Sequence, residues 1–162
     1  RPAILVLSRQ PLPTLDRSRC APADGLQRGA YILLDAEDGR PEVLLLATGS
    51  EVSLCVEAHR RLEADGVVAR VVSMPSWELF ERYCREHPDY REQVLPDAVT
   101  ARVSVEQGAT LGWARYVGRH GHSIGMETFG ASAPLKELQK KFGFVSENVI
   151  DAARTQIARA RR

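Results

Sequence analysis

The sequence predicts an α/β protein, a three-layer α/β/α sandwich built around a mostly parallel sheet of about five strands. Short apolar runs alternate along the chain with segments whose apolar residues recur at helical spacing. The runs are apolar at consecutive positions, which is typical of parallel strands that are buried on both faces. Turn residues such as Gly, Pro and Asp separate the two kinds of segment.

The apolar runs define the strands. Val-Leu-Leu-Leu-Ala at residues 43–47 is a continuous apolar run followed by a glycine-containing turn, as expected of a central strand. We expect strands at residues 31–35, 43–47, 67–74, 101–106 and 122–126.

Helices are expected between these strands. Apolar residues at helical spacing run from Val52 to Leu62, and Gly66 ends that helix as a left-handed cap. Pro75 and Ser76 open the next helix. Further helices are expected at residues 90–94, 111–117, 134–142 and 147–159. Ser132 is expected to cap the N-terminus of the helix at 134–142.

The composition is that of an ordinary globular domain. The 162 residues are 44% hydrophobic and 27% charged, and the formal net charge is +1. This charge balance predicts neither a nucleic-acid nor a membrane partner, and no apolar stretch approaches the roughly 20 residues that span a bilayer. Three widely spaced cysteines without a CxxC pattern predict neither a disulfide framework nor a zinc site, so we expect a reducing, cytoplasmic location.

The first ten residues are predicted to belong to another domain. Residues 3–7 form an apolar run with no strand near it in sequence, followed by Ser8, Arg9 and Gln10. Polar residues at the carboxyl end of a buried strand occupy the place where open α/β sheets bind ligands. Residues 11–29 are rich in Pro, Arg, Asp and Ser and are predicted to be an interdomain linker. From the residues alone, Arg9 is either an exposed linker side chain or a phosphate contact.

Two other strand ends carry polar residues. Thr48-Gly49-Ser50-Glu51 is either a capping box or an anion site at a helix N-terminus, and the nearby carboxylate of Glu51 favours the capping box. Glu106 ends the strand at 101–106, where it could face a crevice or cap the turn at Gly108.

The histidines and the basic tail are assigned structural roles. His59 lies among apolar helix residues and is expected to be a half-buried core histidine. His120 and His122 lack a third ligand close in sequence, so we expect a solvated turn rather than a metal site. The arginines from Arg154 to the C-terminus are expected to complement a helix C-terminus. No complete set of catalytic, cofactor-binding or metal-binding residues is found in the sequence.

Taken in order, several short motifs resemble the C-terminal part of transketolases. The resemblance covers essentially the whole chain, although the segment from Trp77 to Pro88 and the aromatic positions around Trp113 depart from the family pattern. The motifs are Leu7-Ser8-Arg9-Gln10, residues 29–33, Ala47-Thr48-Gly49-Ser50-Glu51-Val52, residues 69–75, Tyr90-Arg91, residues 94–96, Thr128-Phe129-Gly130-Ala131-Ser132-Ala133-Pro134, Phe142-Gly143-Phe144 and Asn148-Val149.

The resemblance implies a parent enzyme and a place for this chain within it. Transketolases are homodimers that use thiamine diphosphate and Mg or Ca to move a two-carbon ketol unit between ketose and aldose phosphates. By resemblance, residues 1–10 are the end of the pyrimidine-binding domain, 11–29 the linker and 30–162 the C-terminal domain. The strand at 31–35 is then antiparallel to the rest. Arg9 matches the family arginine that contacts the sugar phosphate.

The same resemblance implies that the chain is structural and inactive alone. The family's catalytic, cofactor-binding and metal-binding residues lie upstream, so no cofactor is expected on this chain. Its partners would be the upstream domains, a second subunit and sugar phosphates.

Two alternatives are kept. One is a free-standing regulatory module that holds a small anion at Thr48-Gly49-Ser50. The other is the equivalent domain of deoxyxylulose phosphate synthase or of the beta chain of a 2-oxo acid dehydrogenase. The strings Leu-Ser-Arg-Gln and Phe-Gly-Ala-Ser-Ala-Pro favour transketolase.

Overall fold

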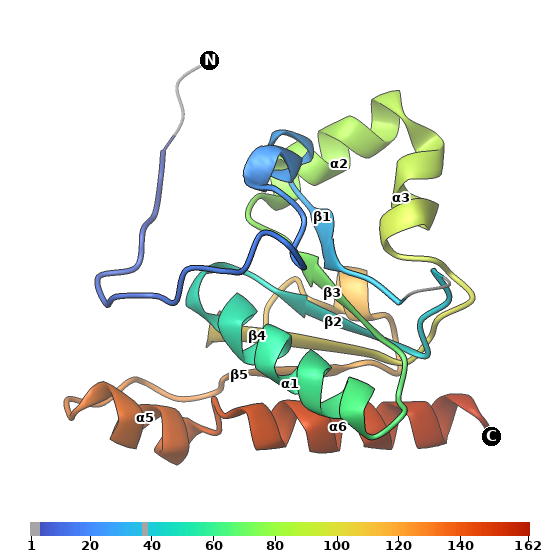
Figure 1. The fold of residues 1–162 in the computed structure, drawn as a ribbon. Coiled ribbons are helices and arrows are strands. Elements are labelled where there is room, and N and C mark those ends of the chain that lie inside the picture. Colours follow the sequence, from blue (N-terminus) through green and yellow to red (C-terminus); the bar gives the residue numbers. More distant parts are fainter. Residues whose placement is uncertain (1–3, 37–38) are drawn as a thin grey trace.

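A mixed β-sheet forms the centre of the molecule. The structure is a computed structural model that describes residues 4–36 and 39–162 (Figure 1). Within these residues one sheet contains five strands in the order β1-β3-β2-β4-β5. Only β1 is antiparallel to its neighbour, β3, and the other pairs are parallel, as predicted. The strands are β1 (Tyr31–Leu34), β2 (Val43–Ala47), β3 (Ala69–Ser73), β4 (Arg102–Ala109) and β5 (His122–Met126).

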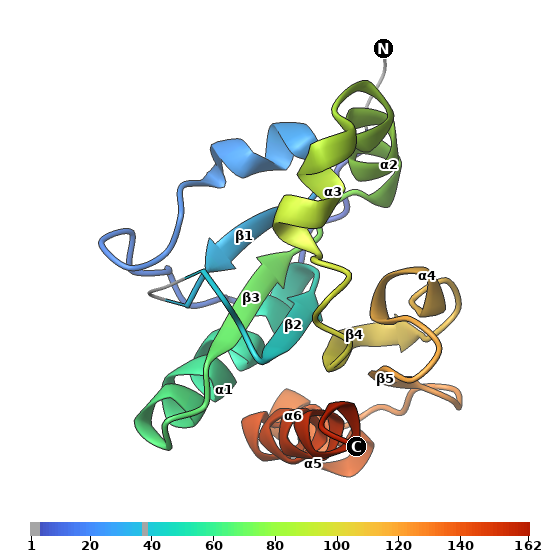
Figure 2. The ribbon, with the colours of Figure 1, turned by 90° about the vertical axis from the view of Figure 1, so that its right-hand side faces the viewer.

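Helices cover both faces of this sheet, so the predicted three layers are confirmed (Figure 2). One layer contains α1 (Val52–Ala64) and α6 (Ser146–Ala160), and the other contains α2 (Trp77–Glu86), α3 (Pro88–Val94) and α4 (Ala114–Val117). The short α5 (Leu135–Phe142) precedes α6, and two 3₁₀ helices, η1 (Ala23–Arg28) and η2 (Gly49–Glu51), complete the elements.

Strand β2 shows why the sequence forms a sheet buried on both sides. Every residue of β2 is buried. Because side chains alternate along a strand, Leu45 packs into the core formed with α1 and α6, whereas Leu44 and Leu46 pack into the core formed with α2, α3 and α4. Both faces therefore need apolar residues, which explains the unbroken run in the sequence.

The predicted elements are present, and the differences have local causes. The predicted helix at 111–117 contracts to Ala114–Val117, because Gly112 adopts a positive φ of 92° that an α-helix does not accommodate. The capping role expected of Ser132 is wrong. Helix α5 begins at Leu135, its N-cap residue is Pro134, and no side chain bonds to that cap.

The segment before β1 is in two parts. Ala3 lies outside the described residues, and Ile4 to Leu7 are exposed, form no strand and run apart from the sheet (Figure 1). Closer to β1, Cys20 is buried and the amide of Ala21 donates a hydrogen bond to the carbonyl of Leu33 at 2.9 Å. The end of the predicted linker, including η1, thus packs on the domain.

Candidate functional site

Arg9, the residue predicted to contact phosphate, lies outside the folded core. Its side chain is exposed in a bend after the apolar segment, and in the described part of the chain it has neither an ion pair nor a hydrogen bond. The guanidinium is therefore a free charged donor fork. The structure does not bring another predicted site residue to Arg9.

The carboxyl edge of the sheet is where an α/β fold offers a binding crevice. Strand β2 has β3 on one side and β4 on the other, so the strand order reverses between β2 and β4. Ligands of open α/β sheets bind at such a switch point. Here the chain's own polar groups bridge the ends of β2 and β4. The carboxylate of Glu51, after β2, accepts hydrogen bonds from the Gln107 backbone amide at 3.0 Å and from its side-chain amide at 2.8 Å.

This arrangement overturns the predicted capping box. Thr48 makes no side-chain bond to the helix that follows it, and Glu51 is buried and turned across to β4. The Ser50 hydroxyl also donates to Glu51 at 2.5 Å. A buried carboxylate stabilised by three donors fills the place where the alternative hypothesis needs an anion, so this turn offers no anion site.

Glu106, at the end of the predicted fourth strand, lines a hollow of about 430 Å³ at the carboxyl edge of the sheet, together with Thr48 and Met74. Its Oε2 accepts a hydrogen bond from the indole Nε1 of the buried Trp113 at 2.7 Å. This bond satisfies a buried indole N–H, which is a structural role. Because the bond holds the Glu106 carboxylate within the domain, the carboxylate is not free for acid–base chemistry.

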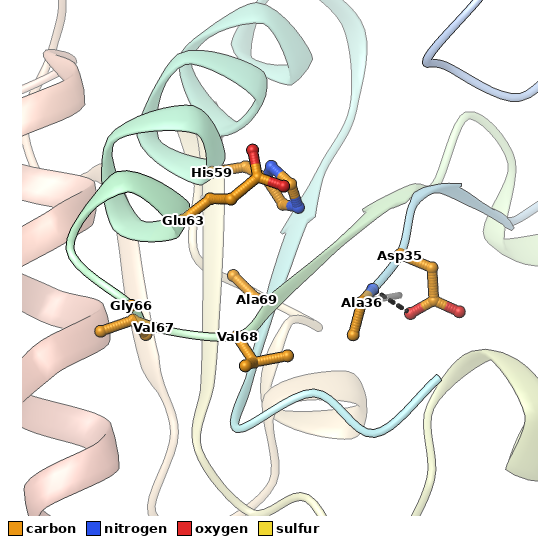
Figure 3. Close-up of a pocket in the computed structure, with 8 residues that line it drawn as sticks. All are labelled: Asp35, Ala36, His59, Glu63, Gly66, Val67, Val68 and Ala69. Atoms are coloured by element: carbon orange, nitrogen blue, oxygen red, sulfur yellow. Dashed lines mark hydrogen bonds between the residues drawn. The ribbon is translucent and has the colours of Figure 1, made fainter. Parts of the chain in front are cut away.

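His59 is a buried core histidine, more buried than predicted, and it lines a pocket of about 480 Å³ (Figure 3). In Figure 3, His59 and Glu63 extend from α1, and Asp35 lies on the other side of Val68 and Ala69. Among the described residues the Nδ1 atom of His59 has no partner. Burial lowers the pKa of this imidazole, and the nearby carboxylate of Glu63 opposes that shift.

The carboxylates of this pocket are already paired with arginines. Glu63 binds Arg19 at 3.0 Å, and Asp35 binds Arg70 through two bonds of 2.7 and 2.9 Å. The pocket thus combines a buried imidazole, whose pKa is lowered by burial, with carboxylates that are already paired with arginines, which is not an acid–base pair.

The remaining predicted residues lie on the surface. His120 and His122 are exposed, and no group of three metal-ligating side chains occurs anywhere in residues 4–36 and 39–162. Two arginines of the basic tail form ion pairs, Arg154 with Asp65 at 2.6 Å and Arg161 with Glu42. The tail therefore ties α6 to neighbouring segments more than it complements the helix terminus.

Sequence reasoning missed the polar contacts that cross between elements. Arg70 is buried in β3, yet it appears in the sequence as one polar residue in an apolar run. That isolated charge was the available signal, because a buried arginine needs a partner. Gln107 gave no such signal, since its bond to Glu51 joins residues 56 positions apart.

Comparisons with known proteins agree on one family. The family model of the transketolase-like TK C-terminal domain matches residues 29–145, more than half of the chain. The transketolase of Geobacillus stearothermophilus is 47% identical over 150 residues, covering 93% of this chain and 22% of its own length. That of Halalkalibacterium halodurans is 49% identical over 154 residues, with 95% and 22% covered.

A solved structure shows the same fold. A transketolase of Pichia stipitis in complex with sedoheptulose 7-phosphate is 36% identical and superposes with a TM-score of 0.79, covering 93% of this chain and 20% of its own. The chain thus spans about a fifth of the length of the relatives that it matches. Within the described residues no helix has the length and apolar content to cross a membrane.

Proposed function

Because this chain belongs to the transketolase family and contains its C-terminal domain, we propose that it serves as the structural C-terminal domain of a working transketolase. The whole protein then moves a two-carbon ketol unit from a ketose phosphate to an aldose phosphate. Because the chain corresponds to about a fifth of its relatives, the reacting groups of this reaction belong to the upstream domains.

The observation that carries the structural role is the bond pair between Glu51 and Gln107, which ties the ends of β2 and β4 together at the switch point with the chain's own polar groups. The described residues also include no group of three or more metal-ligating side chains, so they do not fit a metal-bound diphosphate. Thiamine diphosphate and Mg or Ca are therefore proposed for the upstream domains.

The exposed segment before the domain supports a contact with those upstream domains. Ile4 and Val6 are more than 90% exposed, and Leu5 and Leu7 more than 70%. Burying a large apolar side chain is worth about 1.5–3 kcal/mol. We infer that this segment completes a sheet of the preceding domain, in a cytoplasmic homodimer.

We further propose that Arg9 lies at the edge of the substrate site of the whole protein. A guanidinium without an ion pair in the described residues, directly after a segment that docks on another domain, is suited to a bidentate phosphate contact. A transketolase relative has been solved with sedoheptulose 7-phosphate, a sugar phosphate of the proposed class. The proposed partner of Arg9 is the phosphate group of the sugar.

Steady-state kinetics of the full-length enzyme test this role. Arg9→Ala should raise KM for phosphorylated sugars by roughly 10- to 100-fold, the range expected for losing a charge-assisted bidentate contact. KM for an unphosphorylated analogue should change little. Arg9→Lys keeps the charge but loses the planar fork, so it should restore only part of the affinity.

A matched control is Arg85→Ala, which removes another exposed arginine, on α2. It should leave KM for both kinds of sugar unchanged. If Arg9→Ala raised KM for the two kinds of sugar equally, the phosphate contact would be refuted.

A further inference from the structure

A hollow of about 570 Å³ lies beside the carboxyl-terminal end of α6, away from the crevice at the carboxyl edge of the sheet. It is lined by Thr100, by Arg119 and His120 from the loop between α4 and β5, and by Gln156 and Arg159 of α6. Among its described lining residues there are two arginines and a histidine and no carboxylate. Two separate segments thus bring positive groups to one cavity.

The two arginines are not used by the fold. In the described part of the chain, neither Arg119 nor Arg159 forms an ion pair or a hydrogen bond through its side chain. The other arginine of α6, Arg154, does have an acidic partner, Asp65. Arg119 and Arg159 can therefore donate all their N–H groups to a ligand.

A buried amide also opens to the same hollow. Gln156 is only 3% exposed, and no hydrogen bond to its side chain is formed within residues 4–36 and 39–162. Its amide group lines the hollow, where it is open to a ligand or to water rather than sealed in the core. The hollow thus offers a neutral amide donor beside the two guanidiniums.

The loop that carries Arg119 and His120 is held in place. A Cβ atom at Gly121 would lie 2.3 Å from the carbonyl oxygen of Val117, so the loop returns against the end of α4 too closely for any other residue. The neighbouring arginine therefore projects from a constrained turn rather than from a loose loop.

We propose that this hollow binds a small phosphate-type anion through Arg119, His120 and Arg159, with the Gln156 amide as a buried donor. The α6 C-terminus contributes about half a negative charge nearby, and two guanidiniums outweigh it. A second hollow shares Gln156 and Arg159, and its lining includes the hydroxyls of Ser123 and Thr155 and the carboxylates of Glu127 and Asp151, groups that bind sugar hydroxyls rather than a phosphate. The ligand is thus either inorganic phosphate or the phosphate of a hydroxylated metabolite.

A titration of the isotope-labelled chain followed by NMR tests the site. Inorganic phosphate, added at constant ionic strength, should produce saturable shifts at the Gly121 backbone amide and the Gln156 side-chain amide. Arg119→Gln and Arg159→Gln should each weaken the affinity by about tenfold, the effect of losing one charge-assisted contact. Arg85→Gln, on α2, should bind phosphate as the parent does.

Further additions separate the two sources of phosphate. Tighter binding of glycerol 3-phosphate than of inorganic phosphate assigns the site to an organic phosphate, and equal affinity assigns it to the free anion. Shifts that do not saturate, or that weaken equally in Arg85→Gln, would overturn the proposal. So would saturable binding of glycerol without its phosphate. The spectrum of each variant shows whether it is folded, and none of these outcomes depends on the catalytic role proposed for the whole protein.

Discussion

At the scale of the residue, burial controls the chemistry of the ionisable side chains. Cys55 is fully buried in α1, and burial, with the Glu51 carboxylate as a smaller cause, raises the pKa of its thiol. The reactive form of a cysteine is the thiolate, so this thiol is inert. Cys20 and Cys84 are buried as well, and none of the three cysteines is in a disulfide.

His59 makes stability depend on pH in a direction that follows from its burial. Because the pKa of the folded imidazole is below its ordinary value of 6.5, the unfolded chain takes up the proton first. The free energy of unfolding should therefore fall as pH falls through about 6.5, until His59 is protonated in the folded chain as well. His59→Gln should reduce this slope in urea unfolding measured from pH 8 to 5.

The control for this pH dependence is the exposed His120. His120→Gln should retain the parent's slope. A slope that is the same in the parent and in His59→Gln would show that His59 does not carry the effect.

At the scale of the element, the junction between η1 and β1 depends on one glycine. Gly29 has a φ of 79°, and a Cβ atom there would lie 2.1 Å from the backbone nitrogen of Phe80 and 2.4 Å from the carbonyl oxygen of Ser76. The start of α2 thus packs directly on the backbone before β1. The amide of Ser76 also donates to the carbonyl of Gly29 at 2.9 Å.

Gly29→Ala should destabilise the domain far more than Gly49→Ala. Both glycines have positive φ, which costs alanine about 1–2 kcal/mol. At Gly49 no atom lies within 4 Å of the added Cβ, whereas at Gly29 it meets backbone. We expect a total loss above about 3 kcal/mol for Gly29→Ala, because backbone atoms must move apart. Equal losses in urea unfolding would contradict the close packing seen at Gly29.

At the scale of the whole molecule, Ile4 to Leu7 are exposed and lie apart from the sheet, so we expect the fold to be stable without them. Removing the chain up to Arg9 should change the free energy of unfolding by less than about 0.5 kcal/mol, since the described residues in that stretch are exposed. It should also reduce self-association, because four large apolar side chains leave the surface. Urea unfolding and light scattering measure the two effects.

A longer truncation should destabilise the domain, in contrast to the removal of the chain up to Arg9. Removing the chain up to Ala21 also deletes the buried Cys20 and the hydrogen bond from Ala21 to Leu33. We expect it to cost roughly 1–3 kcal/mol, from lost burial and one unpaired backbone carbonyl. If the two truncations were equally stable, the packing of residues 10–21 on the domain would contribute nothing to the free energy of unfolding.

The sequence pattern predicted the three-layer architecture correctly, because the positions of strands and helices depend on the local periodicity of apolar residues. The unbroken apolar run of β2 predicted a strand covered on both faces, and the helical spacing of α1 predicted its buried side. The helix at 111–117 was overestimated, because the conformation of Gly112 is not apparent from composition. The antiparallel β1 was expected only from family resemblance, since strand direction depends on which strands pair.

By itself, the sequence determined the layers, the strand positions and the family to which the chain belongs. Tertiary structure alone decided what each polar side chain does. Thr48 and Glu51 have the spacing of a capping box, yet Glu51 bonds to Gln107 on another strand. Arg119 and Arg159 are distant in sequence and line one hollow. The physical reason is the separation of the interacting residues along the sequence. Burial and periodicity can be recognised within a single segment, whereas the role of a hydrogen-bonding or charged group depends on a partner that only folding brings near.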